Sequence, residues 1–419
     1  MQSSTVSKAT PLTSTERFCR QLLLKAFAQA EFGTLVICDP DGEYECRGSK
    51  DASAIQARID VQDSACYRDM VLGGSIGAAE AYMTGDWTSP DLTAVIRFMS
   101  RNLNALNRME SGLARLAQPF QRLYHWNNRN TEKGSRRNIA AHYDLGNDLF
   151  QLFLDPTMMY SAGIFPSPYA TMEQASVTKL DRICQKLDLQ PHDHVIEIGT
   201  GWGGFAIHAA THYGCKVTTT TLSQQQHDYA RNEIRARGLE DNITLLLQDY
   251  RDLKGEYDKL VSIEMVEAVG HQYYGAYFET LGRLLKPNGI GLIQAIIIDH
   301  KRYQTAIKNV DFIQRYIFPG SCIPSVNALL QNCSDHSDLQ LTHFEDITPH
   351  YARTLREWRH AFFRNLDKIK ALGYSDEFVR MWDFYFCYCE GGFEERVIGD
   401  VQLLFAKPGY RGQPVLGRL

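Results

Sequence analysis

The sequence predicts an α/β fold: a doubly wound, largely parallel sheet in the C-terminal two thirds, preceded by a small α+β module. Three observations support this prediction. From Val195 onward, short apolar segments alternate with segments of helical periodicity, which is the pattern of parallel strands joined by crossover helices. A glycine-rich turn directly follows the first of these strands. The chain has 419 residues, more than one domain of about 150 residues.

Composition and charge narrow the class of protein. Hydrophobic residues make up 44% and charged residues 22%, which excludes a disordered, collagen-like or coiled-coil chain. The formal net charge is −5, so we expect no nucleic-acid partner. The sequence has no run of about 18 apolar residues, so no helix is expected to cross a bilayer. The ten cysteines form no CxxC pair, which predicts a reduced, cytoplasmic protein without a metal site.

The chain divides into four expected segments. Residues 1–12 are rich in Ser and Thr and are expected to form a flexible tail. Residues 13–100 form the small α+β module, with a strand at 32–38. Residues 101–137 are expected to form a basic amphipathic linker helix, and residues 138–419 form the main α/β domain.

The linker segment is the most basic part of the chain, with eight basic and two acidic residues. Arginines recur at intervals of seven from Arg101 to Arg129, which places them near one face of a helix. Such a face suits an anionic surface such as phospholipid headgroups. The alternative is a linker that packs its apolar side on the core and leaves the arginines in solvent.

Within the α/β domain, the strand order along the chain is expected to begin at Val195 and to end with an edge strand at 401–406. Residues 299–390 are expected to be helix-rich. The strands before this last one are predicted at 195–198, 215–220, 243–247, 259–263 and 289–298.

The glycine-rich turn reads Glu197-x-Gly199-x-Gly201-x-Gly203-Gly204. Its spacing also fits the dinucleotide fingerprint, so spacing alone does not identify the ligand. A dinucleotide fold places an acid at the end of the second strand, whereas here that strand ends in threonines and the acid precedes the glycines. This arrangement resembles the Rossmann-like fold of class I S-adenosylmethionine-dependent methyltransferases.

A series of further motifs, in order along the chain, sharpens the resemblance. They resemble the cyclopropane-fatty-acyl-phospholipid synthase and mycolic acid cyclopropane synthase family from about residue 137 to the C-terminus. The resemblance implies that 138–419 is a catalytic domain with helical lipid-binding insertions. The motifs are Ala141–Asp148, Leu154–Thr157, Met159–Ser161, Gly199–Gly204, Thr221–Ser223 with Gln226, Gln248–Asp252, Met265–Gly270 and Tyr316–Gly320.

The resemblance implies S-adenosylmethionine as cofactor. Its methionine part would lie at the glycine-rich turn, and its ribose and adenine would lie at the ends of the next two strands. The expected binding residues are Tyr160, Ser161, Glu197, Gly199, Gly201, Gly203, Thr221, Leu222, Gln226, Asp249 and Tyr250.

The implied reaction adds the S-methyl carbon to a cis double bond of an acyl chain, and a base then removes a proton from the resulting carbocation. The family holds bicarbonate as this base. Its Glu, Ile and Tyr ligands correspond to Glu267, Ile296 and Tyr351, but Ala162 and Gln294 replace its Cys and His. Gln294 can donate a hydrogen bond but cannot carry a proton. The sequence therefore leaves open whether bicarbonate is bound, and Glu267 is expected to act as base or to stabilise the cation.

These expectations describe a cytoplasmic enzyme, peripheral at the inner face of the membrane, that acts on unsaturated acyl chains of membrane phospholipids. A cyclopropane is the expected product. A methyl-branched alkene is the alternative, because two bicarbonate ligands are replaced. A small-molecule methyltransferase and a non-catalytic lipid-binding protein are further alternatives, and a homodimer is left open.

Overall fold

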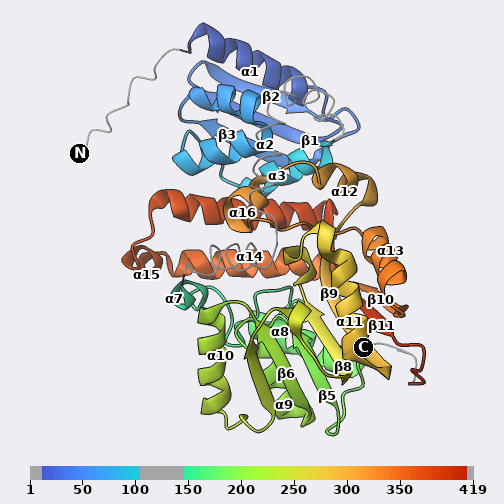
Figure 1. Ribbon diagram of the computed structural model, residues 1–419. Helices are drawn as coiled ribbons and strands as arrows, with labels where there is room; N and C mark the ends of the chain where they lie inside the picture. Colours follow the sequence, from blue (N-terminus) through green and yellow to red (C-terminus); the bar gives the residue numbers. More distant parts are fainter. Residues whose placement is uncertain (1–11, 104–145, 413–419) are drawn as a thin grey trace. The chain divides into compact units, whose positions relative to one another are not determined.

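The computed structural model describes residues 12–103 and 146–412 (Figure 1). The chain separates into two compact units, and each is described by itself. Unit 1 consists of the described residues of two segments, Met1–Phe120 and Tyr374–Glu395. Unit 2 consists of the described residues of Gln121–Gly373 and Arg396–Leu419. The expected linker helix lies almost entirely outside the described residues.

Unit 1 is an α+β module around a four-stranded sheet of order β2-β1-β3-β4. β1 pairs antiparallel with β2 and parallel with β3. A kink at Gly74, with φ of 58°, interrupts one of its helices. Unit 1 contains α1 (Ser14–Phe27), β1 (Phe32–Asp39), β2 (Gly42–Arg47), β3 (Asp51–Val61), α2 (Ala65–Thr84), β4 (Trp87–Thr88), α3 (Leu92–Arg101) and α16 (Asp376–Glu394).

Helix α16 belongs to unit 1, although it comes from the C-terminal part of the chain and the expected 138–419 segment ran without a break. The hydroxyl of Tyr82 on α2 donates to Oδ2 of Asp383 at 2.6 Å, and both residues are buried. A Cβ atom at Gly391 would lie 2.8 Å from Ile96 Cγ2, so α3 approaches α16 too closely for a larger residue. The ring of Phe384 on α16 also packs on that of Tyr82, with ring centroids 5.8 Å apart.

Unit 2 contains a seven-stranded sheet of order β10-β11-β9-β8-β5-β6-β7. The strands from β9 to β7 are parallel, while β11 pairs antiparallel with both β9 and β10. The expected edge strand at 401–406 is thus one strand inside the edge, because β10 covers it. The strands are β5 (His194–Ile198), β6 (Lys216–Thr221), β7 (Ile243–Leu247), β8 (Tyr257–Ile263), β9 (Leu285–Ile298), β10 (Gln340–Asp346) and β11 (Ile398–Ala406).

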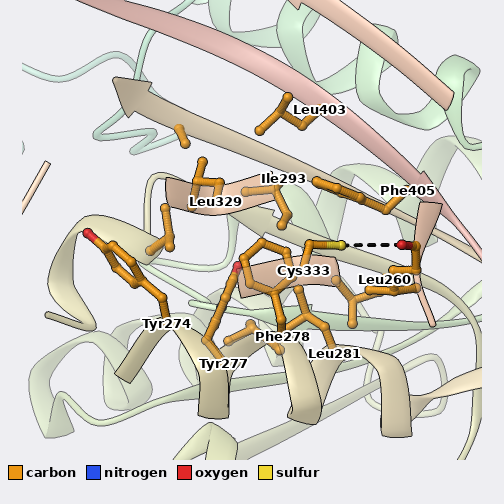
Figure 2. Close-up of a cluster of buried hydrophobic side chains, with 14 of the residues drawn as sticks. Leu260, Tyr274, Tyr277, Phe278, Leu281, Ile293, Leu329, Cys333, Leu403 and Phe405 are labelled. Atoms are coloured by element: carbon orange, nitrogen blue, oxygen red, sulfur yellow. Dashed lines mark hydrogen bonds between the residues drawn. The ribbon is translucent and has the colours of Figure 1, made fainter. Parts of the chain in front are cut away.

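Helices cover both faces of this sheet, as the alternation of β5 side chains requires. Ile196 and Ile198 belong to a core with α11 (Tyr274–Leu284) and α13 (Val326–His336). Figure 2 shows this core, in which the rings of Phe278 and Phe405 lie 5.7 Å apart. Val195 points to the other face. That face packs on α8 (Met172–Lys186), α9 (Gly204–Tyr213) and α10 (Gln224–Ala236).

The remaining elements of unit 2 are short helices and the helices that connect or follow its strands. No helix in the described parts of the chain is long and apolar enough to cross a membrane. These elements are α7 (Asn147–Phe150), α12 (His300–Ala306), α14 (Thr348–Arg364), α15 (Leu366–Ala371), the short helices η2 (Tyr250–Asp252), η3 (Val266–Ala268) and η4 (His271–Tyr273), and the π-helix η5 (Ile313–Ile317).

Candidate functional site

The glycine-rich turn joins β5 to α9 at the carboxyl end of the sheet. Gly199, Gly201 and Gly203 have φ angles of 102°, 53° and 94°, which L side chains rarely adopt. A Cβ atom at Gly201 would meet no other atom within 4 Å, so the turn offers open space beside its backbone. A Cβ atom at Gly204 would lie 2.6 Å from Met159 Sδ, which brings the segment before Tyr160 against the turn. The turn is shaped to admit a ligand close to the main chain.

Buried polar side chains of β5 and β6 form hydrogen bonds next to the turn. Thr219 donates to Oε2 of Glu197 at 2.6 Å, and its hydroxyl lies 2.6 Å from the hydroxyl of Thr200. Burial raises the pKa of Glu197 to about 8, although the hydrogen bond from Thr219 opposes this shift. The structure therefore engages one oxygen of Glu197 with the protein itself.

The ends of β6 and β7 lie beside the turn, since adjacent parallel strands end at the same edge. Thr221 donates to Oε1 of Gln226 at 2.9 Å, and both are buried, whereas Leu222 between them is partly exposed. After β7, Arg251 forms a bidentate pair with Asp249. Tyr250 follows Asp249 directly and is partly exposed.

Three hydrogen-bond donors converge on Glu264, the first residue after β8. The backbone N–H of Ala162 and the Nε2 of Gln294 donate to Oε1 at 2.9 and 2.8 Å. The hydroxyl of Tyr351 on α14 donates to Oε2 at 2.6 Å. Glu264 was not among the residues selected from the sequence, yet three of the five residues expected to hold bicarbonate bind its carboxylate.

The other two expected residues form a second contact. The backbone N–H of Ile296 donates to Oε1 of Glu267. Oε2 of Glu267 is buried and has no hydrogen-bond partner within the described residues. Burial and the nearby Glu264 raise the pKa of Glu267 to about 8. Glu267 thus lies beside Glu264 with one oxygen available.

Two further buried titratable residues, Asp400 and Lys179, complete the cluster. Asp400 on β11 is fully buried, and burial raises the pKa of its carboxyl far above the usual range. Gln294 also donates to its Oδ2 at 3.4 Å. Lys179 on α8 is fully buried and donates to Oγ of Ser161 at 2.9 Å. Burial lowers the pKa of Lys179 to about 8, and Glu264 is the largest of the charges that oppose this shift.

Aromatic rings lie beside these carboxylates, and we call them the aromatic wall. The rings of Tyr351 and Trp358 lie 6.2 Å apart, and those of Trp358 and Tyr160 lie 5.1 Å apart. Tyr160 in turn contacts the ring of Phe318. These contacts place a group of buried and partly buried aromatic rings directly beside the buried polar cluster. The other rings of the aromatic wall are Phe150, Phe153, Trp202 and Phe362.

The sequence-selected residues fall into three neighbouring groups at one edge of the sheet. The first comprises the glycine-rich turn with Tyr160 and Ser161, the second the residues after β6 and β7, and the third the carboxylate group after β8. Sequence reasoning missed Glu264, Lys179 and Asp400. The position of Glu264 was the available signal: it follows a predicted strand and lies three residues before Glu267.

Comparison with known proteins places the chain in the family that its sequence motifs resemble. The sequence profile of the mycolic acid cyclopropane synthetase family matches residues 130–403. The tuberculostearic acid methyltransferase UfaA1 of Mycobacterium tuberculosis is 38% identical over 80% of this chain and 80% of its own length. The cyclopropane-fatty-acyl-phospholipid synthase of Escherichia coli K12 is 36% identical over 84% of this chain and 88% of its own.

A solved structure agrees. The mycolic acid cyclopropane synthase CmaA1, complexed with SAH and CTAB, is 30% identical over 65% of this chain and 98% of its own, with a TM-score of 0.60. S-adenosylmethionine is therefore the cofactor, and the open glycine-rich turn fits it. The chain belongs to the mycolic acid cyclopropane synthetase family and is an S-adenosylmethionine-dependent enzyme.

Proposed function

We propose that this enzyme transfers the methyl carbon of S-adenosylmethionine to a cis double bond in the acyl chains of membrane phospholipids. The observation that supports this most directly is the meeting of three groups at one edge of the sheet. A glycine-rich turn, a buried carboxylate cluster and a wall of aromatic rings all lie at the carboxyl ends of β5, β6 and β8. This is where ligands bind in open α/β sheets.

We assign cofactor binding to the residues around the glycine-rich turn. S-adenosylmethionine supplies an electrophilic methyl carbon when bound. Gly199 and Gly201 let the backbone approach its methionine part, and Tyr160 with Ser161 lies on the neighbouring segment. Thr221 and Gln226, with Leu222, replace the acid that a dinucleotide site would carry, and Asp249 with Tyr250 lies after the next strand.

The substrate assignment rests on the aromatic wall. An alkene within an acyl chain is apolar, so a site that excludes water and presents rings suits it. The ring of Tyr160 contacts those of Phe318 and Trp358. Trp358 in turn contacts the ring of Tyr351. A polar small molecule would leave this surface without a role.

Among the two candidate products, we place the methyl-branched alkene first. The product depends on which proton leaves the cation: loss from the new methyl closes a cyclopropane, whereas loss from a neighbouring carbon restores a double bond. Ala162 and Gln294 stand where bicarbonate ligands were expected, and the methyltransferase UfaA1 is similar over most of the chain. The Escherichia coli synthase supports a cyclopropane as the second candidate.

A product assay tests this proposal. Purified enzyme is incubated with methyl-labelled S-adenosylmethionine and vesicles of a cis-monounsaturated phospholipid, and the acyl chains are analysed by mass spectrometry and NMR. We expect a one-carbon gain with a retained double bond. Cyclopropane protons would select the second candidate. Vesicles with saturated chains are the control, and no gain on any unsaturated lipid would overturn the proposal.

We further propose that the enzyme works in the cytoplasm at the inner membrane surface, using the basic residues 101–137. Replacing Arg108, Arg115 and Arg122 with Glu should weaken binding to anionic vesicles, as measured by co-sedimentation. A matched control replaces Arg231, Arg235 and Arg237 of the α10 region with Glu, which changes the net charge equally. Equal losses in both variants would contradict a specific lipid-binding segment.

A further inference from the structure

The side-chain carboxylate of Glu264 lies where several elements of unit 2 meet. Its oxygens accept hydrogen bonds from Ala162, from Gln294 on β9 and from Tyr351 on α14. Its backbone N–H donates to the carbonyl of Gln294 at 2.8 Å. Both the main chain and the side chain are therefore fixed, and the carboxylate lies beside Glu267 and the aromatic wall.

The backbone at Glu264 is strained. Its φ angle is 47°, in the left-handed region that a non-glycine residue occupies only at an energetic cost. Such residues persist only when their surroundings over-determine them, and they gather at functional sites. Glycine would adopt this conformation without strain, so a glutamate here indicates that its side chain is needed.

Burial and the neighbouring charged groups act in opposite directions on the pKa of this carboxylate. Burial raises the pKa of Glu264, while its three hydrogen bonds and the cation of Lys179 on α8 oppose that shift. Glu267 on η3 and Asp400 on β11 are the other acids beside it. Glu267 receives one backbone donor, whereas Glu264 receives three donors. Asp400 makes a side-chain hydrogen bond with Glu264, and its pKa lies far above the usual range, so Glu264 is the best stabilised anion of the three.

We propose that Glu264 is the proton acceptor of the reaction, a base built into the chain. This inference rests on the proposed function. As the S–CH₃ bond breaks, its electron pair stays on the sulfur of the released S-adenosylhomocysteine. The alkene π pair bonds one alkene carbon to the methyl carbon, and the adjacent carbon becomes cationic. A C–H electron pair then neutralises that cation, and the released proton passes to the carboxylate of Glu264. The proton returns to solvent before the next turnover.

The same geometry argues against bicarbonate. Ala162, Gln294 and Tyr351 direct their donors at Glu264, so these donors are not available to a separate anion. Glu267 and Ile296 alone offer an acidic group and an N–H that is already engaged. We derive no step through bicarbonate for this chain.

Two substitutions separate a base from a structural residue. Glu264→Gln keeps the shape and removes the proton-accepting charge. Glu264→Gly removes the side chain, relieves the backbone strain and leaves three donors around an empty volume. Asp188→Gly is the matched control, because Asp188 is an exposed acid with a φ of 49°. Each protein is assayed for methyl transfer with and without formate or bicarbonate. Its melting temperature is also measured with and without each anion.

We expect both Glu264 variants to lose about 10²-fold or more in kcat, as loss of a general base does, while S-adenosylmethionine binding is retained. Formate or bicarbonate should restore activity to Glu264→Gly and raise its melting temperature, and should affect neither Glu264→Gln nor Asp188→Gly. Near-normal kcat in Glu264→Gln would overturn the proposal, as would an anion response in the wild type equal to that of Glu264→Gly.

The proposed function and this inference fail separately. If the wild type methylates no lipid, the proposed function is lost. The melting experiment then still decides whether Glu264 fills an anion site, because it needs no substrate. If the wild type is active and Glu264→Gln equals it, only the inference is lost. Should Glu264→Gly not fold, the kcat and pH profile of Glu264→Gln decide alone.

Discussion

The hydroxyl of Tyr351 donates a 2.6 Å hydrogen bond to Oε2 of Glu264, across 87 residues of sequence. This bond joins helix α14 to the end of β8. It also links the carboxylate cluster to the aromatic wall, because the ring of Tyr351 contacts Trp358. The aromatic rings and the acid thus meet at one residue.

Tyr351→Phe should alter the pH dependence of turnover. The hydrogen bond from Tyr351 lowers the pKa of Glu264, so its removal raises that pKa further. The reaction needs the ionised carboxylate, and the rising limb of kcat against pH should therefore move to higher pH, with a smaller loss at pH 9 than at pH 7. Rate profiles for both proteins measure this.

Trp358→Phe is the comparison for Tyr351→Phe. It changes a ring beside Tyr351 and leaves the hydroxyl bond in place. We expect it to affect KM for lipid without moving the pH profile. An unchanged pH profile in Tyr351→Phe would argue that its hydroxyl only supports the fold.

Glu267→Gln should remove most turnover and keep cofactor binding, because Glu267 lies in the carboxylate cluster and the cofactor residues lie at the neighbouring turn. Its effect on stability should depend on pH. Burial and Glu264 raise the pKa of Glu267 to about 8 from 4.5. Its stabilising contribution is thus complete below pH 4.5 and is lost as pH rises through about 8.

The glutamine variant lacks this loss, so its melting temperature relative to wild type should rise between pH 5 and pH 9. Glu197 has the same raised pKa and stays in both proteins as a common background. Scanning calorimetry at both pH values measures the difference. A difference in melting temperature that does not change with pH would contradict a buried acid with a raised pKa at position 267.

The parallel sheet was predictable because each buried strand forms an apolar run between turn signals. Strand β10 was not, since its burial pattern is mostly exposed and its sequence, Gln340 to Asp346, carries little apolar character. The grouping of α16 with unit 1 depends on contacts such as Tyr82 with Asp383, which lie 301 residues apart. No local pattern encodes that pairing.

The candidate site shows the same division. Motif order located the glycine-rich turn, Glu267 and Tyr351, because those signals are local. The role of Glu264 depends on where the donors of Ala162 and Gln294 point, and on a φ angle of 47°, both of which arise from tertiary structure. A sequence read alone shows only an acid after a strand.

Tyr82→Phe should destabilise unit 1. The substitution removes the 2.6 Å donor from the buried carboxylate of Asp383, which should cost about 1–3 kcal/mol. Tyr67→Phe is the matched comparison, because it also removes a tyrosine hydroxyl from a buried carboxylate, that of Asp39. Asp39 keeps its ion pair with Arg20 at 2.8 Å, and Asp383 keeps its contact with Cys387 Sγ at 3.9 Å. We expect the smaller loss in Tyr67→Phe, measured by urea unfolding. A larger loss in Tyr67→Phe would contradict this account of the Asp383 contact.

Gly199→Ala should weaken S-adenosylmethionine binding by about tenfold or more, since a shift of 1.4 kcal/mol suffices for that factor. Position 199 has a φ of 102°, and a Cβ atom there would lie 3.2 Å from Met265 Cγ, so the turn must move. Gly238→Ala is the control: its φ of 65° imposes similar backbone strain, but no atom lies within 4 Å of its Cβ position. Both variants should lose stability, and titration calorimetry should show an affinity change in Gly199→Ala alone. Equal weakening in both would mean that backbone strain, acting on the whole unit, controls cofactor affinity rather than the local shape of the turn.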